Sequence, residues 1–258
     1  GGGGGGGVAV VPRALWEVDR LRTREELALA VELLAREARD LGYEGYTLEL
    51  PYDRSTVGVA GALRGAWAQV LGAAAPPPKL ILVVQPPPAR IQGEAAQLDK
   101  SVIRELSPYI HRFMIMTYDH AMKQAQMGGG ALPGPNAPAA WVEAIVGPLA
   151  NDPGVEDGKL MLGVPFYGWE HAAGQPPRPV LQRDFEVLAR TTQMEANWMA
   201  PAREHVFIFR DPSGQGDRVM SYPTMLFLQE RVKIAQAFGV GIGIWELGQG
   251  FDRFVEVL

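Results

Sequence analysis

Short apolar runs alternate with segments of helical periodicity along most of the chain. Residues 79–85 and 159–165 are almost unbroken apolar runs, which is typical of strands covered on both faces. Apolar and polar positions alternate instead at residues 42–51, so that Glu49 shares a face with Thr47. We expect six strands, at residues 8–15, 42–51, 79–85, 111–119, 159–168 and 240–246. Strands that alternate with helices in this way predict a parallel sheet with right-handed crossovers.

The helices are predicted from spacing and from their first residues. Thr23, followed three residues later by Glu26, forms the pattern of a capping box, and apolar residues then recur at helical spacing to about Asp40. We expect further helices at residues 57–71, 98–106, 139–149 and 224–238.

Two regions depart from this alternation. Residues 205–210 and 218–222 have the pattern of a β-hairpin around a Gly-rich turn, placed just before the last helix and strand. The loop at residues 120–138 is rich in Gly, Pro and Met and is long for a compact domain, which favours a lid or a binding loop. We expect Met122 and Met127 to pack within that loop.

The last strand carries the most distinctive chemistry. Residues 240–244 are apolar or Gly, and Trp245 and Glu246 follow where the strand ends. Ligands bind at the carboxyl ends of parallel strands in sheets and barrels. An indole there is a flat apolar platform with one N–H donor, which suits the face of a sugar ring, although a Trp at a strand end can also be core.

Composition excludes several classes of function. The 258 residues, 47% hydrophobic and 21% charged, describe one ordinary globular domain. A net charge of -5 argues against a nucleic-acid partner, and no apolar run is long enough to span a membrane. The chain has no Cys, and its four His lack metal-ligand spacing, so we expect neither disulfides nor a metal site. Residues 1–7 are all Gly, which indicates a flexible tail or a sequence artefact and lacks the features of a signal peptide.

Three motifs occur in the order in which a known family has them. Residues 116–119 (Met-Thr-Tyr-Asp), 159–168 (Lys-Leu-Met-Leu-Gly-Val-Pro-Phe-Tyr-Gly) and 244–249 (Ile-Trp-Glu-Leu-Gly-Gln) resemble the sixth, seventh and eighth strands of glycoside hydrolase family 18, the chitinases. The segment from 205 to 238 resembles the α+β insertion before the last strand of that family. The resemblance implies a (β/α)8 TIM-type barrel that needs no cofactor.

The resemblance begins at the third strand of the family and runs from residue 8 to residue 258. We therefore expect a barrel domain at 8–258 that lacks its first two strand–helix units, with an incomplete N-terminus. Residues 134–138 and 244–250 more narrowly resemble a chitinase-like branch that includes a receptor-binding protein. This implies an extracellular, endomembrane or lysosomal location, although no signal peptide is visible.

The catalytic strand departs from the family pattern Asp-Gly-X-Asp-X-Asp-X-Glu. Residues 44–51 read Glu-Gly-Tyr-Thr-Leu-Glu-Leu-Pro, so that Glu49 lies at the last Asp position, Thr47 at the middle one and Pro51 at the catalytic Glu. In this family that Glu protonates the glycosidic oxygen while the substrate acetamide acts as nucleophile. Proline has no proton to donate, and general-acid catalysis contributes about 10²–10⁴-fold.

The resemblance also assigns roles to individual residues. Trp245 resembles the floor of the sugar subsite, and Tyr118 and Asp119 resemble the pair that contacts the substrate acetamide. Glu49 is expected to be a buried anchor hydrogen-bonded to Tyr118, or else it or Asp53 has replaced the lost acid. The remaining candidates for the walls of the cleft, each of which can equally be core or face a loop, are Trp16, Phe166, Tyr167, Trp169 and Glu246.

Three functions follow as hypotheses. The first is a chitinase-like lectin that binds N-acetylglucosamine oligosaccharides with little or no hydrolysis. The second is a glycoside hydrolase that uses Glu49 or Asp53 as its acid. The third is a protein-interaction scaffold with a relict cleft and a protein receptor as its partner.

Overall fold

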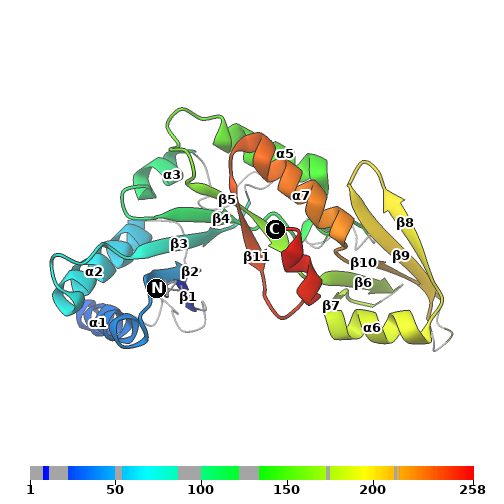
Figure 1. Cartoon of the computed structure of the whole chain (residues 1–258), viewed down its shortest axis with the longest axis horizontal. Coiled ribbons are helices and arrows are strands. Elements are labelled where there is room, and N and C mark those ends of the chain that lie inside the picture. Colours follow the sequence, from blue (N-terminus) through cyan, green and yellow to red (C-terminus); the bar gives the residue numbers. More distant parts are fainter. Residues whose placement is uncertain are drawn as a thin grey trace. The chain divides into compact units, whose positions relative to one another are not determined.

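A computed structural model describes residues 8–11, 23–49, 54–86, 100–121, 134–172, 175–211, 214 and 216–258. The chain divides into two compact units (Figure 1). The first contains Gly1–Ile115 and Asp152–Leu160, and the second contains Met116–Asn151 and Met161–Leu258.

The first unit is built on parallel strands with helices between them (Figure 1). Its elements are β1 (Val8–Val11), α1 (Arg24–Leu41), β2 (Gly45–Leu48), α2 (Arg54–Leu71), β3 (Lys79–Val84), α3 (Lys100–Leu106) and β4 (Arg112–Ile115). β1 pairs with β2, β2 with β3 and β3 with β4, each in parallel. The predicted capping box is confirmed, since Thr23 Oγ1 accepts the Glu26 N–H at 3.1 Å and Glu26 accepts the Thr23 N–H at 3.0 Å. The alternation of strands and helices predicted for this part of the chain is therefore correct.

β2 has the two distinct faces that its pattern predicts. Tyr46 and Leu48 are buried, and the Tyr46 hydroxyl donates to the Leu34 carbonyl of α1 at 2.8 Å. On the other face, Thr47 and Glu49 are half-buried. β2 is shorter than the predicted strand, and Glu49 directly follows its last residue.

Gly45 is required by the close approach of β2 to β3. A Cβ on Gly45 would lie 2.0 Å from the carbonyl oxygen of Lys79, which is backbone and cannot rotate away. We therefore expect Gly45→Ala to lower the free energy of unfolding by about 3 kcal/mol, at the upper end of the range for overpacking. Urea denaturation followed by circular dichroism measures this change.

Gly65 of α2 provides the matched control. It is exposed and has nothing within 4 Å of its Cβ position. Gly65→Ala should stabilise the protein by roughly 0.5–1 kcal/mol, because Ala is the better helix former. Equal effects of the two substitutions would show that the β2–β3 approach is looser than described.

The second unit combines a parallel pair of strands with an antiparallel sheet. β5 (Leu160–Pro165) pairs in parallel with β11 (Gly241–Trp245). The helices α5 (Ala139–Ala150) and α7 (Met225–Phe238) pack against each other within this unit, and η3 (Asp252–Glu256) follows β11. Thr224 caps α7 by accepting the Phe227 N–H at 3.3 Å.

The predicted hairpin is part of a larger antiparallel sheet. The predicted pair corresponds to β9 (Glu204–Arg210) and β10 (Asp217–Ser221), and the full strand order is β7-β6-β10-β9-β8. Four elements were not predicted: β6 (Gly168–Ala172), β7 (Arg178–Val180), α6 (Gln182–Thr191) and β8 (Met194–Met199). No residue of α6 is buried, and the residues of β8 are exposed or half-buried, so neither element has an apolar run that marks it in the sequence.

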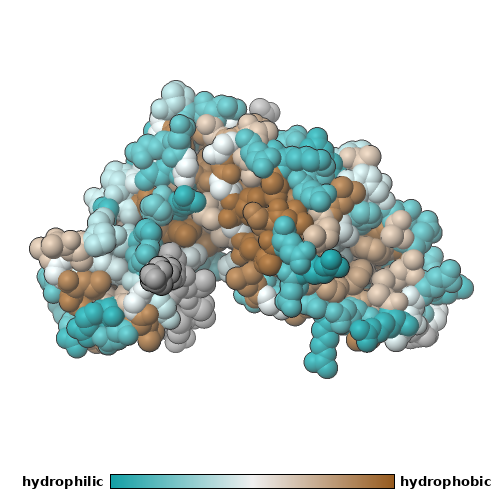
Figure 2. All heavy atoms as spheres, viewed as in Figure 1, coloured by the Kyte–Doolittle hydropathy of each residue, from teal (hydrophilic) through white to brown (hydrophobic). Residues whose placement is uncertain are grey.

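β11 is not the fully buried strand that its apolar residues predict. Ile242 and Ile244 are half-exposed, and β5 is the only pairing partner of β11 among the described residues. Figure 2 shows hydrophobic residues gathered at the surface around β11. A hollow of about 370 Å³ there is lined by Val232, Ala235, Gln236, Val240, Ile242, Ile244 and Leu258. Within the described part of the chain, β11 is therefore an edge strand with an apolar side that reaches solvent.

Candidate functional site

Two aromatic rings meet at the carboxyl ends of strands. Tyr118 lies three residues beyond the end of β4, and Trp245 is the last residue of β11. Their rings are stacked, with centroids 6.5 Å apart and planes 27° apart. Tyr118 is buried and Trp245 is half-exposed, so the structure brings together these two predicted site residues.

Asp119 lies beside this aromatic pair and is held by two ring donors. Its Oδ1 atom accepts the hydroxyl of Tyr167 and the indole N–H of Trp169, the latter at 2.8 Å. Burial, followed by the charge of Asp119, raises the pKa of Tyr167 above its ordinary value, so this hydroxyl remains a donor. Both bonds fall on Oδ1, and no group among the described residues bonds to Oδ2. The half-buried carboxylate therefore keeps one oxygen for a further donor.

Of the aromatic residues predicted to line the cleft, some lie in the site and one lies in the core. Tyr167 is buried, and its ring makes T-shaped contacts with the rings of Tyr118 and Trp169, with centroid distances of 6.2 and 6.0 Å. Phe166 is buried against Phe254 at 5.3 Å and belongs to the core. Tyr167 and Trp169 thus join the Tyr118 cluster, whereas Phe166 does not.

Glu246 faces a turn. Its side chain is exposed and accepts a hydrogen bond from the Gln249 amide at 3.0 Å. The peptide bond between Trp245 and Glu246 is cis. Of the two roles considered for Glu246, the loop-facing one matches this contact.

Asn136 connects Asp119 to the rest of the unit, and sequence reasoning gave it no role. Its Oδ1 accepts the backbone N–H of Asp119 at 2.7 Å, and its Nδ2 donates to the Tyr167 carbonyl at 3.2 Å. Asn136 is buried and lies in the motif at residues 134–138, so the motif itself was the available signal. The predicted binding loop therefore contributes a residue to the site at its carboxyl end.

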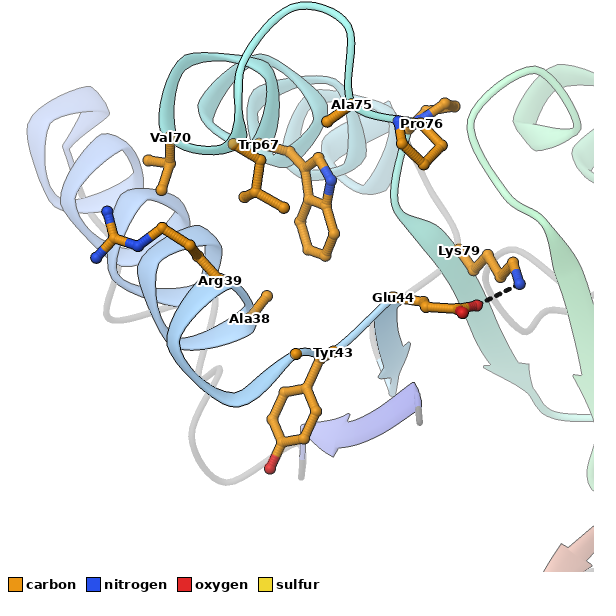
Figure 3. Close-up of a pocket in the computed structure, with 12 residues that line it drawn as sticks. Ala38, Arg39, Tyr43, Glu44, Trp67, Val70, Ala75, Pro76 and Lys79 are labelled. Carbon is orange, nitrogen blue, oxygen red and sulfur yellow. Dashed lines mark hydrogen bonds and ion pairs between the residues drawn. The ribbon is translucent and has the colours of Figure 1, made fainter. Parts of the chain in front are cut away.

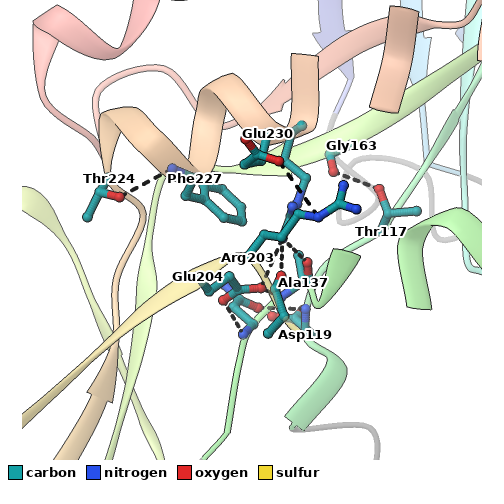
Figure 4. A network of polar contacts seen from close by, with 12 residues as sticks. Thr117, Asp119, Ala137, Gly163, Arg203, Glu204, Thr224, Phe227 and Glu230 are labelled. Carbon is teal, nitrogen blue, oxygen red and sulfur yellow. Dashed lines mark hydrogen bonds and ion pairs between the residues drawn. The ribbon is translucent and has the colours of Figure 1, made fainter. Parts of the chain in front are cut away.

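A buried ion pair between Glu204 and Arg231 supports the 134–137 segment, and Figure 4 shows Glu204 beside Ala137 of that segment. Glu204 of β9 accepts the backbone N–H groups of Asn136 and Ala137 at 2.9 and 2.7 Å. Arg231 of α7 lies 3.4 Å from Glu204 and also donates to the Ala137 and Ala202 carbonyls. Burial raises the pKa of Glu204 to about 7, although Arg231 and the two amides act in the opposite direction. The sequence feature that could have indicated this ion pair is Arg231, a charged residue among the buried positions of α7.

The remaining candidates lie elsewhere or outside the described residues. Glu49 belongs to the first unit and Tyr118 to the second, so their hydrogen bond stays a prediction. Trp16, Pro51, Asp53 and the Met122–Met127 part of the loop lie outside the described residues.

A cavity in the first unit holds none of the predicted site residues. It has a volume of about 660 Å³ and is lined by residues of α1, α2 and the segments that follow them, including Trp67, Tyr43 and the ion-paired Glu44 and Lys79 (Figure 3). In the described part of the chain, no group of three or more His, Asp or Glu side chains is placed to hold a metal ion. Among the helices described, none is long and apolar enough to cross a bilayer.

Comparison with protein-family models finds no match to this sequence. Solved structures that are similar to it in fold include the following three. A chitinase from Chromobacterium violaceum ATCC 12472 is 20% identical, with a TM-score of 0.68 over 91% of this chain and 71% of its own. A glycoside hydrolase family 18 N-acetylglucosaminidase from Paenibacillus barengoltzii is 16% identical, with a TM-score of 0.66 over 93% and 77%.

The third structure is YKL-39, solved in the presence of chitooligosaccharides. It is 12% identical, with a TM-score of 0.70 over 96% of this chain and 78% of its own. The predicted α/β fold class is confirmed by these likenesses. The chain has the barrel-type fold of glycoside hydrolase family 18 chitinases and chitinase-like proteins.

Proposed function

We propose that this protein binds oligosaccharides of N-acetylglucosamine, such as chitin fragments, with little or no hydrolysis. The observation that carries the proposal is the half-exposed Trp245 indole stacked on Tyr118 beside the Asp119 carboxylate. A flat apolar surface next to a charged acceptor suits a sugar that has an apolar ring face and an amide N–H.

The indole supplies the apolar part of such a site. The ring of Trp245 is backed by the buried Tyr118, which limits the orientations that the indole can adopt. A rigid aromatic side chain loses little conformational entropy when a ligand stacks on it. A pyranose ring laid on the open face of Trp245 would bury its axial C–H groups there.

Asp119 supplies the polar part. Its Oδ2 atom has no partner among the described residues, whereas Oδ1 already accepts two bonds from rings. An acetamido N–H that donates to Oδ2 would make a charge-assisted hydrogen bond. This contact would favour N-acetylglucosamine over glucose.

Relatives of similar fold support the choice of ligand. YKL-39 was solved in the presence of chitooligosaccharides, and the other two structures are a chitinase and an N-acetylglucosaminidase. We place the chain within glycoside hydrolase family 18 and, by the motifs at 134–138 and 244–250, near chitinase domain-containing protein 1. On the same grounds we propose an extracellular or endomembrane location and a protein receptor as a second partner.

We expect no efficient hydrolysis because, by the resemblance to family 18, Pro51 takes the position of the catalytic acid. The competing function is a glycoside hydrolase in which Glu49 is the acid, which is supported by the half-buried position of Glu49 directly after β2. We expect the full chain to release no reducing sugar from chitotetraose above the buffer rate. Glu49→Gln should then leave that baseline unchanged. Sugar release that disappears in Glu49→Gln would establish the hydrolase instead.

Binding itself is tested by isothermal titration calorimetry of the full chain with chitotetraose and with cellotetraose. Cellotetraose has the same backbone linkage and lacks the acetamido groups. We expect tighter binding of chitotetraose. If neither sugar binds, the lectin function is wrong, and the scaffold hypothesis takes its place.

A further inference from the structure

Asn136 makes four hydrogen bonds, and each of them fixes a different part of the site. Its side-chain oxygen accepts the Asp119 N–H, and its side-chain nitrogen donates to the Tyr167 carbonyl. Its own carbonyl accepts the His120 N–H at 2.8 Å, and its own N–H donates to Glu204 at 2.9 Å. One buried side chain thus joins the segments that follow β4 and β5.

The bond to Asp119 matters because Asp119 has an uncommon backbone conformation. Its φ angle is +64°, in the left-handed region that residues with a side chain avoid. Such a conformation persists where surrounding contacts impose it. The 2.7 Å hydrogen bond from the Asp119 N–H to Asn136 Oδ1 is a contact of this kind, because it fixes the orientation of the peptide group that precedes the Asp119 Cα. It also sets where the Asp119 carboxylate points.

The hydrogen bond from Asn136 to the Tyr167 carbonyl positions a residue that itself donates to the Asp119 carboxylate. The Tyr167 hydroxyl donates to Asp119 Oδ1, and the Tyr167 carbonyl accepts from Asn136. Asn136 therefore holds both the acceptor and one of its donors. A shift of Asn136 would move Asp119 and Tyr167 relative to each other.

Asn136 is itself held by Glu204 and Arg231. Glu204 is buried, and its two oxygens accept from the consecutive backbone amides of Asn136 and Ala137, which fixes the peptide planes on both sides of the Asn136 Cα atom. Arg231, whose guanidinium lies 4.4 Å over the ring of Phe227, holds the same segment through the Ala137 carbonyl. All the hydrogen bonds that Arg231 makes to this segment come from Nη2, and its Nε and Nη1 atoms have no hydrogen-bond partner among the described residues.

We propose that Asn136 is a positioning residue for recognition of the acetamido group. It holds Asp119 and Tyr167 in the arrangement in which Asp119 Oδ2 faces the ligand, and Glu204 holds Asn136 in place. This inference rests on the proposed function. On this proposal, the 134–137 segment is responsible for the preference for N-acetylated sugars over sugars without acetamido groups. Stacking on Trp245 contributes to the binding of both kinds of sugar.

The ratio of the dissociation constants for cellotetraose and chitotetraose tests the proposal. A substitution that only lowers the folded fraction weakens the binding of both sugars by the same factor, so it leaves this ratio unchanged. We expect Asn136→Ala to lower the ratio about tenfold, the size expected when one charge-assisted hydrogen bond is lost. Titrations of the full chain below the unfolding temperature of each variant supply the values.

Two further variants complete the experiment. Glu204→Gln keeps the size of the side chain and removes one acceptor, so it should lower the ratio in the same direction and by less. Asn197→Ala, a substitution of the same type on β8 outside this network, should leave the ratio at the wild-type value. An unchanged ratio in Asn136→Ala, with wild type that binds and discriminates, overturns the positioning role alone. Failure of wild type to bind chitotetraose overturns both the positioning role and the proposed function.

Discussion

We expect Trp245→Ala to weaken the binding of chitotetraose about 100-fold. Truncation of a central aromatic anchor in a binding site typically costs about 2–4 kcal/mol, and each 1.4 kcal/mol is a factor of ten in the dissociation constant. The substitution removes both the half-exposed stacking surface and the ring that packs on Tyr118. Calorimetric titration of wild type and variant measures the loss.

Trp198 supplies the matched control for this experiment. It lies on β8, is 36% exposed and packs against His205 at 4.8 Å between ring centroids. Trp198→Ala removes a more exposed indole from the same unit and should leave the dissociation constant unchanged within error. If both substitutions weaken binding equally, the role assigned to Trp245 is wrong.

The largest expected change in stability comes from Arg231→Met. This substitution leaves Glu204 buried without a cation, and breaking one side of a buried ion pair typically costs about 3–5 kcal/mol. Loss of the positive charge also raises the Glu204 pKa further above its ordinary value. A carboxyl whose folded-state pKa is raised binds its proton more tightly in the folded state, so stability falls as pH rises from about 4.3 through that pKa. The destabilisation should therefore be smaller at pH 5 than at pH 8.

Urea denaturation at the two pH values measures this effect. The double variant Arg231→Met with Glu204→Gln should recover part of the loss, because no unpaired charge remains buried. Lys233→Met, on the same helix, breaks an exposed pair with Glu230 and should cost about 1 kcal/mol or less. A loss in Arg231→Met that does not depend on pH would contradict a charged Glu204.

The parallel part of the fold could be predicted from local pattern, whereas the antiparallel sheet could not. Thr23 and Glu26 define the start of α1 by themselves, and the apolar run at β3 is explained by burial on both faces. α6 has no buried residue, although its Phe185 packs on Phe207 and Tyr222. α6 has only ten residues, most of them polar, so the helical spacing of Phe185 and Leu188 was too short a pattern to be recognised from sequence.

The site was predictable where it follows strand ends and unpredictable where it depends on tertiary contacts. Tyr118, Asp119, Tyr167 and Trp245 all lie beyond or at the ends of strands, and the structure brings them together. Glu204 lies 68 positions from Asn136, and no local pattern connects residues at that separation. Their pairing depends on how β9, α7 and the 134–137 segment pack.

The open edge of β11 has a consequence for what can pair with this strand. Its outer edge presents backbone N–H and C=O groups that no described strand satisfies, and its sequence Gly-Ile-Gly-Ile-Trp contains neither a charge nor a proline. Natural sheets protect such edges with lysine, proline or a bulge, because an unguarded edge is a template for a strand from another molecule. A strand that added to this edge, from the same protein or from another molecule, would lie beside Trp245 at the end of β11.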